Sequence, residues 1–293
     1  MPESETFPEP TALGFAADGD QGWLKTIRGR TFRFQILQTL GDLASAEELQ
    51  ESAYGISERD LVSANELVVV KETGGAVLGV FAADESGPAL GAVIGWGGFV
   101  GHPRLVSDFM AVRAEARNFG LATELKRLQA AIAWKAGFEE IVWTVDPLLA
   151  ANARLNFGKL GAISRHYEID RYGSWFATDR YGGMPSDRLH LSWEITRPEV
   201  VARIVNPSAY QADPAWSTLS KYCAGSKERA VQIAIPADID ALVQADPGAA
   251  YAYRMRLRDH LPRAFDEGFV VCGFIPAEGE RDPSLLLRHL PAD

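Results

Sequence analysis

The pattern of apolar and polar positions predicts alternating strands and helices from Phe32 onward. Alternating or continuous apolar runs predict strands over residues 32–37, 76–83, 89–100, 106–112, 140–147 and 188–195. Apolar residues at helical spacing predict helices over 42–55, 121–137 and 149–162. Asp42 is a candidate N-cap for the first of these helices, and Gly137 and Gly161 suit the C-caps of the other two. The order of elements is therefore β, α, β, β, β, α, β, α and a further strand.

The pattern loosens after Pro198 and then resumes, which indicates a second part of the chain. Strands are expected over 230–236, 269–276 and 284–290, with helices between 237 and 268. A chain of 293 residues exceeds the common size of one domain. We therefore predict a flexible tail over 1–30, a domain over 31–198 and a subdomain over 199–293. The predicted class is α/β with a mixed sheet, and the second part is expected to pack on or extend the first sheet.

The composition is that of an ordinary globular protein. Hydrophobic residues make up 47% of the chain and charged residues 23%, and the formal net charge of −10 argues against a nucleic-acid partner. No secretory signal or membrane-spanning run is visible, so we expect a cytoplasmic protein with no membrane partner. Cys223, Cys272 and histidines such as His102, His166 and His190 show no metal-ligand spacing, so no metal is expected.

The segment from Arg117 to Ala122 carries the clearest chemistry. It reads R-x-x-G-x-A between a predicted strand and a predicted helix. Backbone N–H groups at a helix start, together with the positive end of the helix dipole, can hold a phosphate group. Gly120 would let the main chain approach that phosphate, and Ala122 is too small to obstruct it. A glycine in this position is about as often only a turn.

With this motif in this order of elements, residues 32 to 195 resemble the GNAT superfamily of CoA-dependent N-acyltransferases. The resemblance implies a GNAT fold, with a C-terminal appendage whose element order resembles half of such a fold. It also implies acetyl-CoA or another acyl-CoA as co-substrate, bound by the strand end and the motif. The residues implied are Met110, Ala111, Val112, Arg117, Asn118, Phe119, Gly120, Leu121, Ala122 and Thr123. Asn152 and Asn156 share a predicted helix face and could bind CoA or substrate, although a solvated face is the simpler interpretation.

Three short segments extend the resemblance to uncharacterised bacterial proteins predicted to be GNAT acetyltransferases. These proteins share segments like WTFDP, KLGA and PTDRL, and this chain has WTVDP, KLGA and PSDRL. Some of them are thought to lie beside N-succinylamino-acid racemases. The resemblance thus suggests succinyl-CoA and an amino acid as alternatives to acetyl-CoA and another small amine.

One position departs from the family pattern. GNAT enzymes often protonate the departing thiolate with a tyrosine where this chain has Phe157, which has no proton to give. Tyr167 and Tyr172 are the candidate replacements, although each could simply be a tyrosine at the edge of the core. Asp108 is the candidate base for the attacking amine, or else a solvent-facing aspartate. Asp146 precedes a proline and is better explained as a turn opener.

Two functions follow from these residues. One is an acyltransferase that moves an acetyl or succinyl group to the amine of a small molecule by direct attack. The other, motivated by Phe157, is a non-catalytic acyl-CoA-binding or regulatory protein. Arg254, Arg256 and Arg258 could meet an anionic group, but surface ion pairs are the more common use of such arginines. The sequence leaves open whether the C-terminal part is a lid, a homodimer surface or a partner site.

Overall fold

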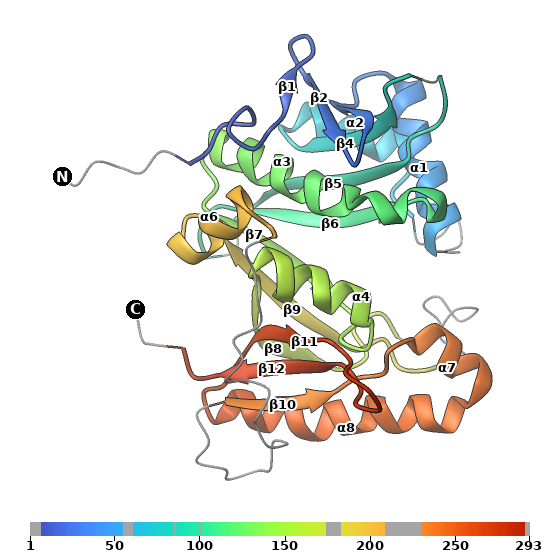
Figure 1. Cartoon of the computed structure of the whole chain (residues 1–293), viewed down its shortest axis with the longest axis vertical. Coiled ribbons are helices and arrows are strands. Elements are labelled where there is room, and N and C mark those ends of the chain that lie inside the picture. The colour runs from blue at the N-terminus through green and yellow to red at the C-terminus, as the bar shows by residue number, and fades with distance from the viewer. Residues whose placement is uncertain are drawn as a thin grey trace, which may run out of the picture. The chain divides into compact units, whose positions relative to one another are not determined.

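A computed structural model describes residues 7–54, 61–84, 86–99, 101–173, 183–208 and 230–290 of the chain. The chain divides into two compact units, Met1–Val142 with Glu194–Val205, and Trp143–Trp193 with Asn206–Asp293 (Figure 1). This division differs from the boundary expected at residue 198. The chain leaves the first unit after Val142, inside the strand Glu140–Val145, and returns to it at Glu194, the last residue of the strand Arg188–Glu194. Most of the chain between these points, which we predicted to belong to the GNAT domain, is therefore part of the second unit.

The first unit contains a sheet in the order β1-β2-β3-β4-β5-β6-β7, in which only the β6–β7 pair is parallel. Its strands are β1 (Ala16–Ala17), β2 (Gly22–Ile27), β3 (Arg30–Ile36), β4 (Ala76–Ala82), β5 (Gly91–Gly98), β6 (Arg104–Val112) and the start of β7 (Glu140–Val145). Its helices are α1 (Leu40–Tyr54), α2 (Ala64–Glu72), η1 (Ala114–Phe119), α3 (Leu121–Lys135) and α6 (Pro198–Val205). The predicted mixed α/β class is confirmed.

Residues 7–30, which we expected to belong to a flexible tail, contain ordered elements. The strand β2 pairs with β3 along its whole length, from Gly22–Gln35 to Ile27–Arg30. Phe15 is 2% exposed and packs edge-on against Phe34, with ring centroids 5.2 Å apart. The acidic and proline-rich composition of this segment hid the β2–β3 hairpin, to which it contributes the half-buried Trp23, Leu24 and Ile27.

Two helix starts differ from the sequence expectation. Thr39, rather than Asp42, caps α1, because the Thr39 hydroxyl accepts from Asp42 N at 3.1 Å and the Asp42 carboxylate accepts from Thr39 N at 3.2 Å. The helix α2 was not predicted. It begins at a capping box in which Ser63 and Glu66 exchange the same kind of bonds.

Two groups of helices cover the two faces of this sheet. The helices α1 and α2 pack on a core that includes Leu67, Ile94 and Phe109. The helix α3 contacts β4, β5 and β6 and is buried along most of its surface, including Leu125 and Leu128. As predicted, α3 is closed by Gly137, whose φ is +88°.

The second unit has strands in the order β7-β9-β8-β11-β12-β10. Besides the end of β7, its elements are α4 (Ala150–Ala153), η2 (Arg154–Leu160), β8 (Ile163–Glu168), β9 (Arg188–Glu194), β10 (Ala230–Ala234), α7 (Ile239–Ala245), α8 (Pro247–Asp266), β11 (Val270–Ile275) and β12 (Ser284–Arg288). The strand β11 pairs with β8 at Val271 and Ser164, so within this unit the C-terminal segment extends the sheet.

The C-terminal segment repeats the order of elements found at β3-α1-α2-β4-β5, but not the pairing. In the first unit β3 pairs with β4 and β4 with β5. In the second unit β10 pairs with β12, and β12 lies between β10 and β11. The expected likeness to half a GNAT domain therefore holds for the element order alone.

Among the described residues, every helix is too short or too polar to cross a membrane.

Candidate functional site

The alternation of side chains along β6 is interrupted at Asp108. Ile94 of β5 pairs with Phe109 and Gly95 pairs with Ser107, so Asp108 is the extra residue of a β-bulge. Bulges are over-represented beside active sites, where they redirect side chains. Asp108 remains accessible to solvent, yet partial burial raises the pKa of its carboxyl group.

The end of β6 leads directly into the predicted phosphate-binding motif. Met110, Ala111 and Val112 pair with β5, whereas the ladder between β6 and β7 ends at Val106. Arg117 then donates from Nε to the carbonyl oxygen of Val112 at 3.3 Å. This bond fixes the basic side chain beside the end of the strand.

The motif itself forms a sharp joint between two helices. Arg117, Asn118 and Phe119 end the 3₁₀ helix η1, and Gly120 adopts the left-handed conformation with φ +82°. Leu121, Ala122 and Thr123 form the first turn of α3, and Thr123 N already donates to the carbonyl oxygen of Gly120 at 3.0 Å. The N–H groups that precede it are of the kind that a helix start generally leaves without an intrahelical partner. A Cβ at Gly120 would meet no atom within 4 Å, so the space beside the joint is open.

Two basic residues missed by the sequence analysis lie beside this joint. Arg28 donates from Nη1 to the carbonyl oxygen of Asn118 at 2.7 Å, and the Arg30 guanidinium lies 6.0 Å from the ring centroid of Phe119. Both come from the β2–β3 hairpin, part of which we had taken for a tail. Together with Arg117 they place positive charge around the start of α3, which favours an anionic ligand.

A buried lysine connects β6 to α3. Lys126 is 2% exposed and donates to Ser107 Oγ at 2.7 Å and Gln129 Oε1 at 3.1 Å. Ser107 also donates to Gln129 Oε1 at 3.0 Å. Ser107 faces α3 while Phe109 faces α1 and α2, and the Asp108 bulge permits this difference. The polar trio thus fixes the strand on which Asp108 lies.

Replacing Lys126 by methionine is expected to make stability less dependent on pH. Burial lowers the pKa of Lys126 from 10.5 to about 7. Between these values the unfolded chain holds a proton that the folded chain lacks, so stability rises with pH by up to about 1.4 kcal/mol per unit. In urea denaturation from pH 7 to 10, the free energy of unfolding of Lys126→Met should exceed that of the native chain by the largest amount at pH 7. A difference constant across this range would contradict a neutral buried amine.

The second unit contains Phe157 in an unusual helix. The helix α4 passes into the π-helix η2 at Arg154, and π turns are frequent at functional sites. Phe157 is fully buried in η2. Asn156 is also buried, whereas Asn152 is half-buried. The helix type changes between these two asparagines. Gly161 closes η2 in the left-handed conformation, as predicted.

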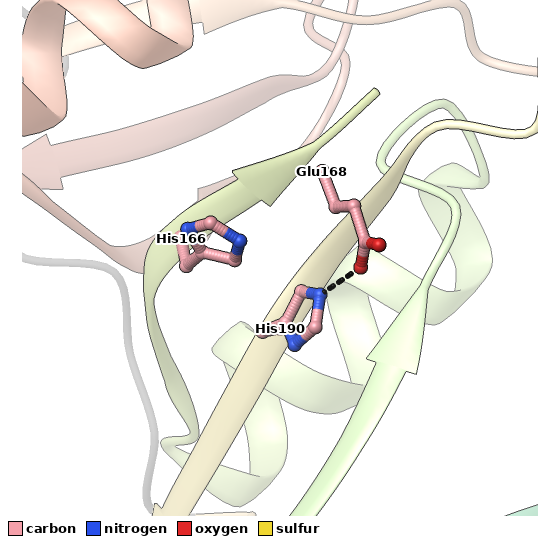
Figure 2. Close-up of side chains that lie close together, drawn as sticks. All are labelled: His166, Glu168 and His190. Atoms are coloured by element: carbon pink, nitrogen blue, oxygen red, sulfur yellow. Dashed lines mark hydrogen bonds and ion pairs between the residues drawn. The ribbon is translucent and has the colours of Figure 1, made fainter. Parts of the chain in front are cut away.

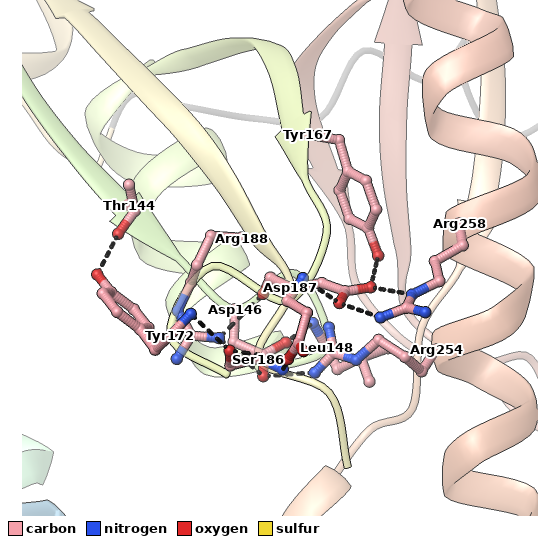
Figure 3. Close-up of polar contacts among 11 residues, drawn as sticks. Thr144, Asp146, Leu148, Tyr167, Tyr172, Ser186, Asp187, Arg188, Arg254 and Arg258 are labelled. Carbon is pink, nitrogen blue, oxygen red and sulfur yellow. Dashed lines mark hydrogen bonds and ion pairs between the residues drawn. The ribbon is translucent and has the colours of Figure 1, made fainter. Parts of the chain in front are cut away.

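Tyr167 is held inside a buried polar network (Figure 3). Its hydroxyl donates to Asp187 Oδ2 at 2.5 Å, and Arg258 donates to both oxygens of Asp187 at 2.8 and 2.7 Å. Burial, together with the Asp187 carboxylate, raises the pKa of Tyr167 far above its usual value. Burial opposes the charge of Asp187, but the Arg258 and Tyr167 bonds outweigh it and lower the pKa of this carboxyl. Tyr167 is therefore a poor proton donor.

Asp146 forms the second carboxylate of the same network. One oxygen accepts from Leu148 N at 2.9 Å, which is the turn expected before Pro147. The other accepts from Arg254 Nη2 at 2.7 Å and lies 3.7 Å from Arg188 Nη1. Arg254 is fully buried, so the prediction of a surface ion pair is wrong for this residue. Burial disfavours its charge, but Asp146 outweighs this and raises the pKa of Arg254.

Tyr172 has an environment different from that of Tyr167. It is 36% exposed, and its hydroxyl lies 3.2 Å from Thr144 Oγ1 (Figure 3). The guanidinium groups of Arg171 and Arg188 lie 5.4 and 5.1 Å from its ring centroid. Of the two candidate tyrosines, Tyr172 is the more exposed, at 36% against 8% for Tyr167.

Solved structures similar to this chain include acetyltransferases of the GNAT family. No protein-family model and no curated protein matches the sequence. The NatC complex bound to Gag peptide and CoA is 15% identical with a TM-score of 0.45, and 56% of this chain covers 98% of that chain. The ribosomal-protein-S18-alanine N-acetyltransferase from Escherichia coli is 16% identical with a TM-score of 0.45, at 57% and 95% coverage. A GNAT acetyltransferase from Streptococcus pneumoniae is 15% identical with a TM-score of 0.43, at 55% and 97% coverage.

Proposed function

We propose that this chain is a CoA-dependent N-acyltransferase of the GNAT type, which moves an acetyl or succinyl group to the amine of a small molecule. The observation that carries the proposal is the left-handed Gly120 between η1 and α3, with open space beside it and Arg117 and Arg28 nearby. Backbone N–H groups at a helix start, the helix dipole and basic side chains suit the pyrophosphate of CoA. Met110, Ala111 and Val112 are proposed to bind the pantetheine arm.

The proposed reaction is direct attack of the amine on the thioester carbonyl carbon. A C–N bond forms, the C–S bond breaks, and CoA leaves as the thiolate or thiol. Asp108 is proposed to accept the proton of the amine, directly or through water, and its raised pKa makes it a stronger base. Tyr172 is proposed to return a proton to the thiolate. Asn152 and Asn156 remain proposed contacts for the substrate or CoA.

The test is turnover. The full chain is incubated with acetyl-CoA or succinyl-CoA and a panel of small amines that includes amino acids, and release of free thiol is followed. Amine-dependent release is expected with one donor. Saturable CoA binding without release from either donor, across the panel, would contradict the enzyme and favour an acyl-CoA-binding protein. The fully buried Phe157 motivates that second function, because its side chain has no proton to give.

Replacing Tyr172 by phenylalanine is expected to lower kcat by about 10²-fold or more while CoA affinity stays unchanged, since loss of acid catalysis typically costs this much. Tyr167→Phe is the matched control, because it removes one hydroxyl from the same unit. It should reduce stability by about 1–3 kcal/mol through the bond to Asp187 and change kcat less. Steady-state kinetics and urea denaturation of both variants check this. Equal kcat in Tyr172→Phe and the native chain would remove Tyr172 from the mechanism.

A further inference from the structure

Three potential metal ligands converge on neighbouring strands of the second unit. His166 of β8 pairs directly with His190 of β9, and Glu168 follows His166 by two residues. Figure 2 shows their side chains approaching one another from the two strands. Their ligand atoms all lie within 4.8 Å of one another. Each histidine offers one ring nitrogen and Glu168 offers a carboxylate oxygen, which is the donor set of two histidines and one carboxylate found in zinc and iron(II) sites.

The cluster lies on the more accessible side of these strands. Along β8 and β9 its three residues are exposed or half-buried, whereas the intervening Tyr167 and Leu189 are buried. A β-bulge in β8 between Ser164 and His166 sets the register that brings the two histidines opposite each other. A cation from solvent could therefore reach the three donors without opening the core.

Two of the three potential metal ligands, Glu168 and His190, already lie against the positive charge of Arg171. The His190 Nε2 atom lies 2.6 Å from Glu168 Oε2, and Arg171 Nη1 lies 2.5 Å from the same oxygen and 3.3 Å from His190 Nε2. One nitrogen cannot both donate to Glu168 and accept from Arg171. A metal ion would satisfy the lone pairs of nitrogen and oxygen together. The Arg171 side chain is 34% exposed, so it can turn toward solvent when an ion takes its place.

We propose that His166, Glu168 and His190 bind one divalent transition-metal ion of the Zn²⁺ class, and that Arg171 leaves Glu168 when the ion binds. Three protein ligands leave at least one coordination position open for water or a small anion. The ion would connect β8 to β9 through side chains, beyond their backbone ladder. Binding is independent of CoA and of acyl transfer.

The experiment is titration of the metal-free full chain with ZnCl₂ by calorimetry, with Co²⁺ absorption as a second readout. One saturable site is expected, and saturating Zn²⁺ should raise Tm. His190→Ala and His166→Ala should each lower affinity at least about tenfold and remove the rise in Tm, because each deletes a ligand. Arg171→Met should strengthen binding, since it removes the competing cation.

The chain offers a matched control. His102 Nε2 lies 2.7 Å from Glu140 Oε2 on the first unit, a histidine–glutamate pair of the same kind but outside the three-residue cluster. His102→Ala should leave affinity and the Tm shift unchanged. Absence of saturable binding, or binding that survives His166→Ala and His190→Ala, would overturn the proposal. A sulfur-to-metal charge-transfer band with Co²⁺ would also overturn it, because it would assign the ion to a cysteine.

Discussion

Replacing Gly120 by glutamate is expected to weaken binding of CoA by at least about 100-fold, or about 2.7 kcal/mol. Two effects add. Gly120 has φ +82°, which costs a residue with a side chain about 1–2 kcal/mol, and relief of that strain would move the joint out of the conformation proposed to hold the pyrophosphate. The new carboxylate would also occupy the open space beside the first turn of α3, where it would repel the pyrophosphate. Calorimetric titration of the full chain with CoA measures the change.

Gly137 provides the matched control for this variant. It lies beyond the other end of α3, has φ +88°, and a Cβ there would likewise meet no atom within 4 Å. Gly137→Glu therefore carries similar backbone strain and the same charge without obstructing the proposed cradle. It should lower stability while CoA affinity changes less than about threefold. Equal losses of affinity in the two variants would mean that the joint at Gly120 does not hold the phosphates.

The second large effect is expected when Arg254 is replaced by methionine. The ion pair with Asp146 is buried on both sides, with side chains 0% and 1% exposed. Removing one partner leaves an uncompensated buried charge, which typically costs about 3–5 kcal/mol. Arg188, at 3.7 Å from Asp146, offsets part of this loss, so we expect the lower end of the range. Urea denaturation at neutral pH measures the free energy of unfolding.

Arg263 of the same helix is the control for that loss. It pairs with Asp259 at 2.6 Å, but its side chain is 57% exposed. Arg263→Met should cost less than about 1 kcal/mol, as is usual for exposed pairs. The double variant Asp146→Asn with Arg254→Met should cost less than the sum of the two single variants. Additive losses would show that the two charges do not stabilise each other. The Nε and Nη1 atoms of Arg254 have no hydrogen-bond partner in the described part of the chain, which lowers the net contribution of the pair.

Local features of the fold were predictable from the sequence because local chemistry determines them. The apolar runs of β4 and β5, the spacing along α3 and the closing glycines Gly137 and Gly161 all gave the element that the structure contains. The helix α2 was missed because a run of three valines is as typical of a strand as of a helix. Its capping box at Ser63 and Glu66 is visible in the sequence and would have indicated a helix start.

Features that depend on distant residues were not predictable. Asp146 and Arg254 are 108 positions apart, and no pattern in one chain connects them. The same holds for His166 and His190, because strand register rather than sequence spacing brings them together. The bulge at Asp108 was predictable only in part. A Ser-Asp pair inside an apolar strand indicates an irregularity, but it does not indicate which side chain changes face.

The short pairing between β11 and β8 affects how the second unit unfolds. Their pairing is confined to Val271 and Ser164 among the described residues, whereas β11 and β10 each pair with β12 over several residues. The attachment of this segment therefore relies on the packing of β11 against η2 and of α8 against β8, together with the ion pairs of α8, more than on a backbone ladder. Partial unfolding would release β10, β11 and β12 together, as one cooperative unit, before the strands of the first sheet separate. In hydrogen exchange such a segment is expected to behave as a single foldon, to whose stability two aspartates outside it, Asp146 and Asp187, contribute.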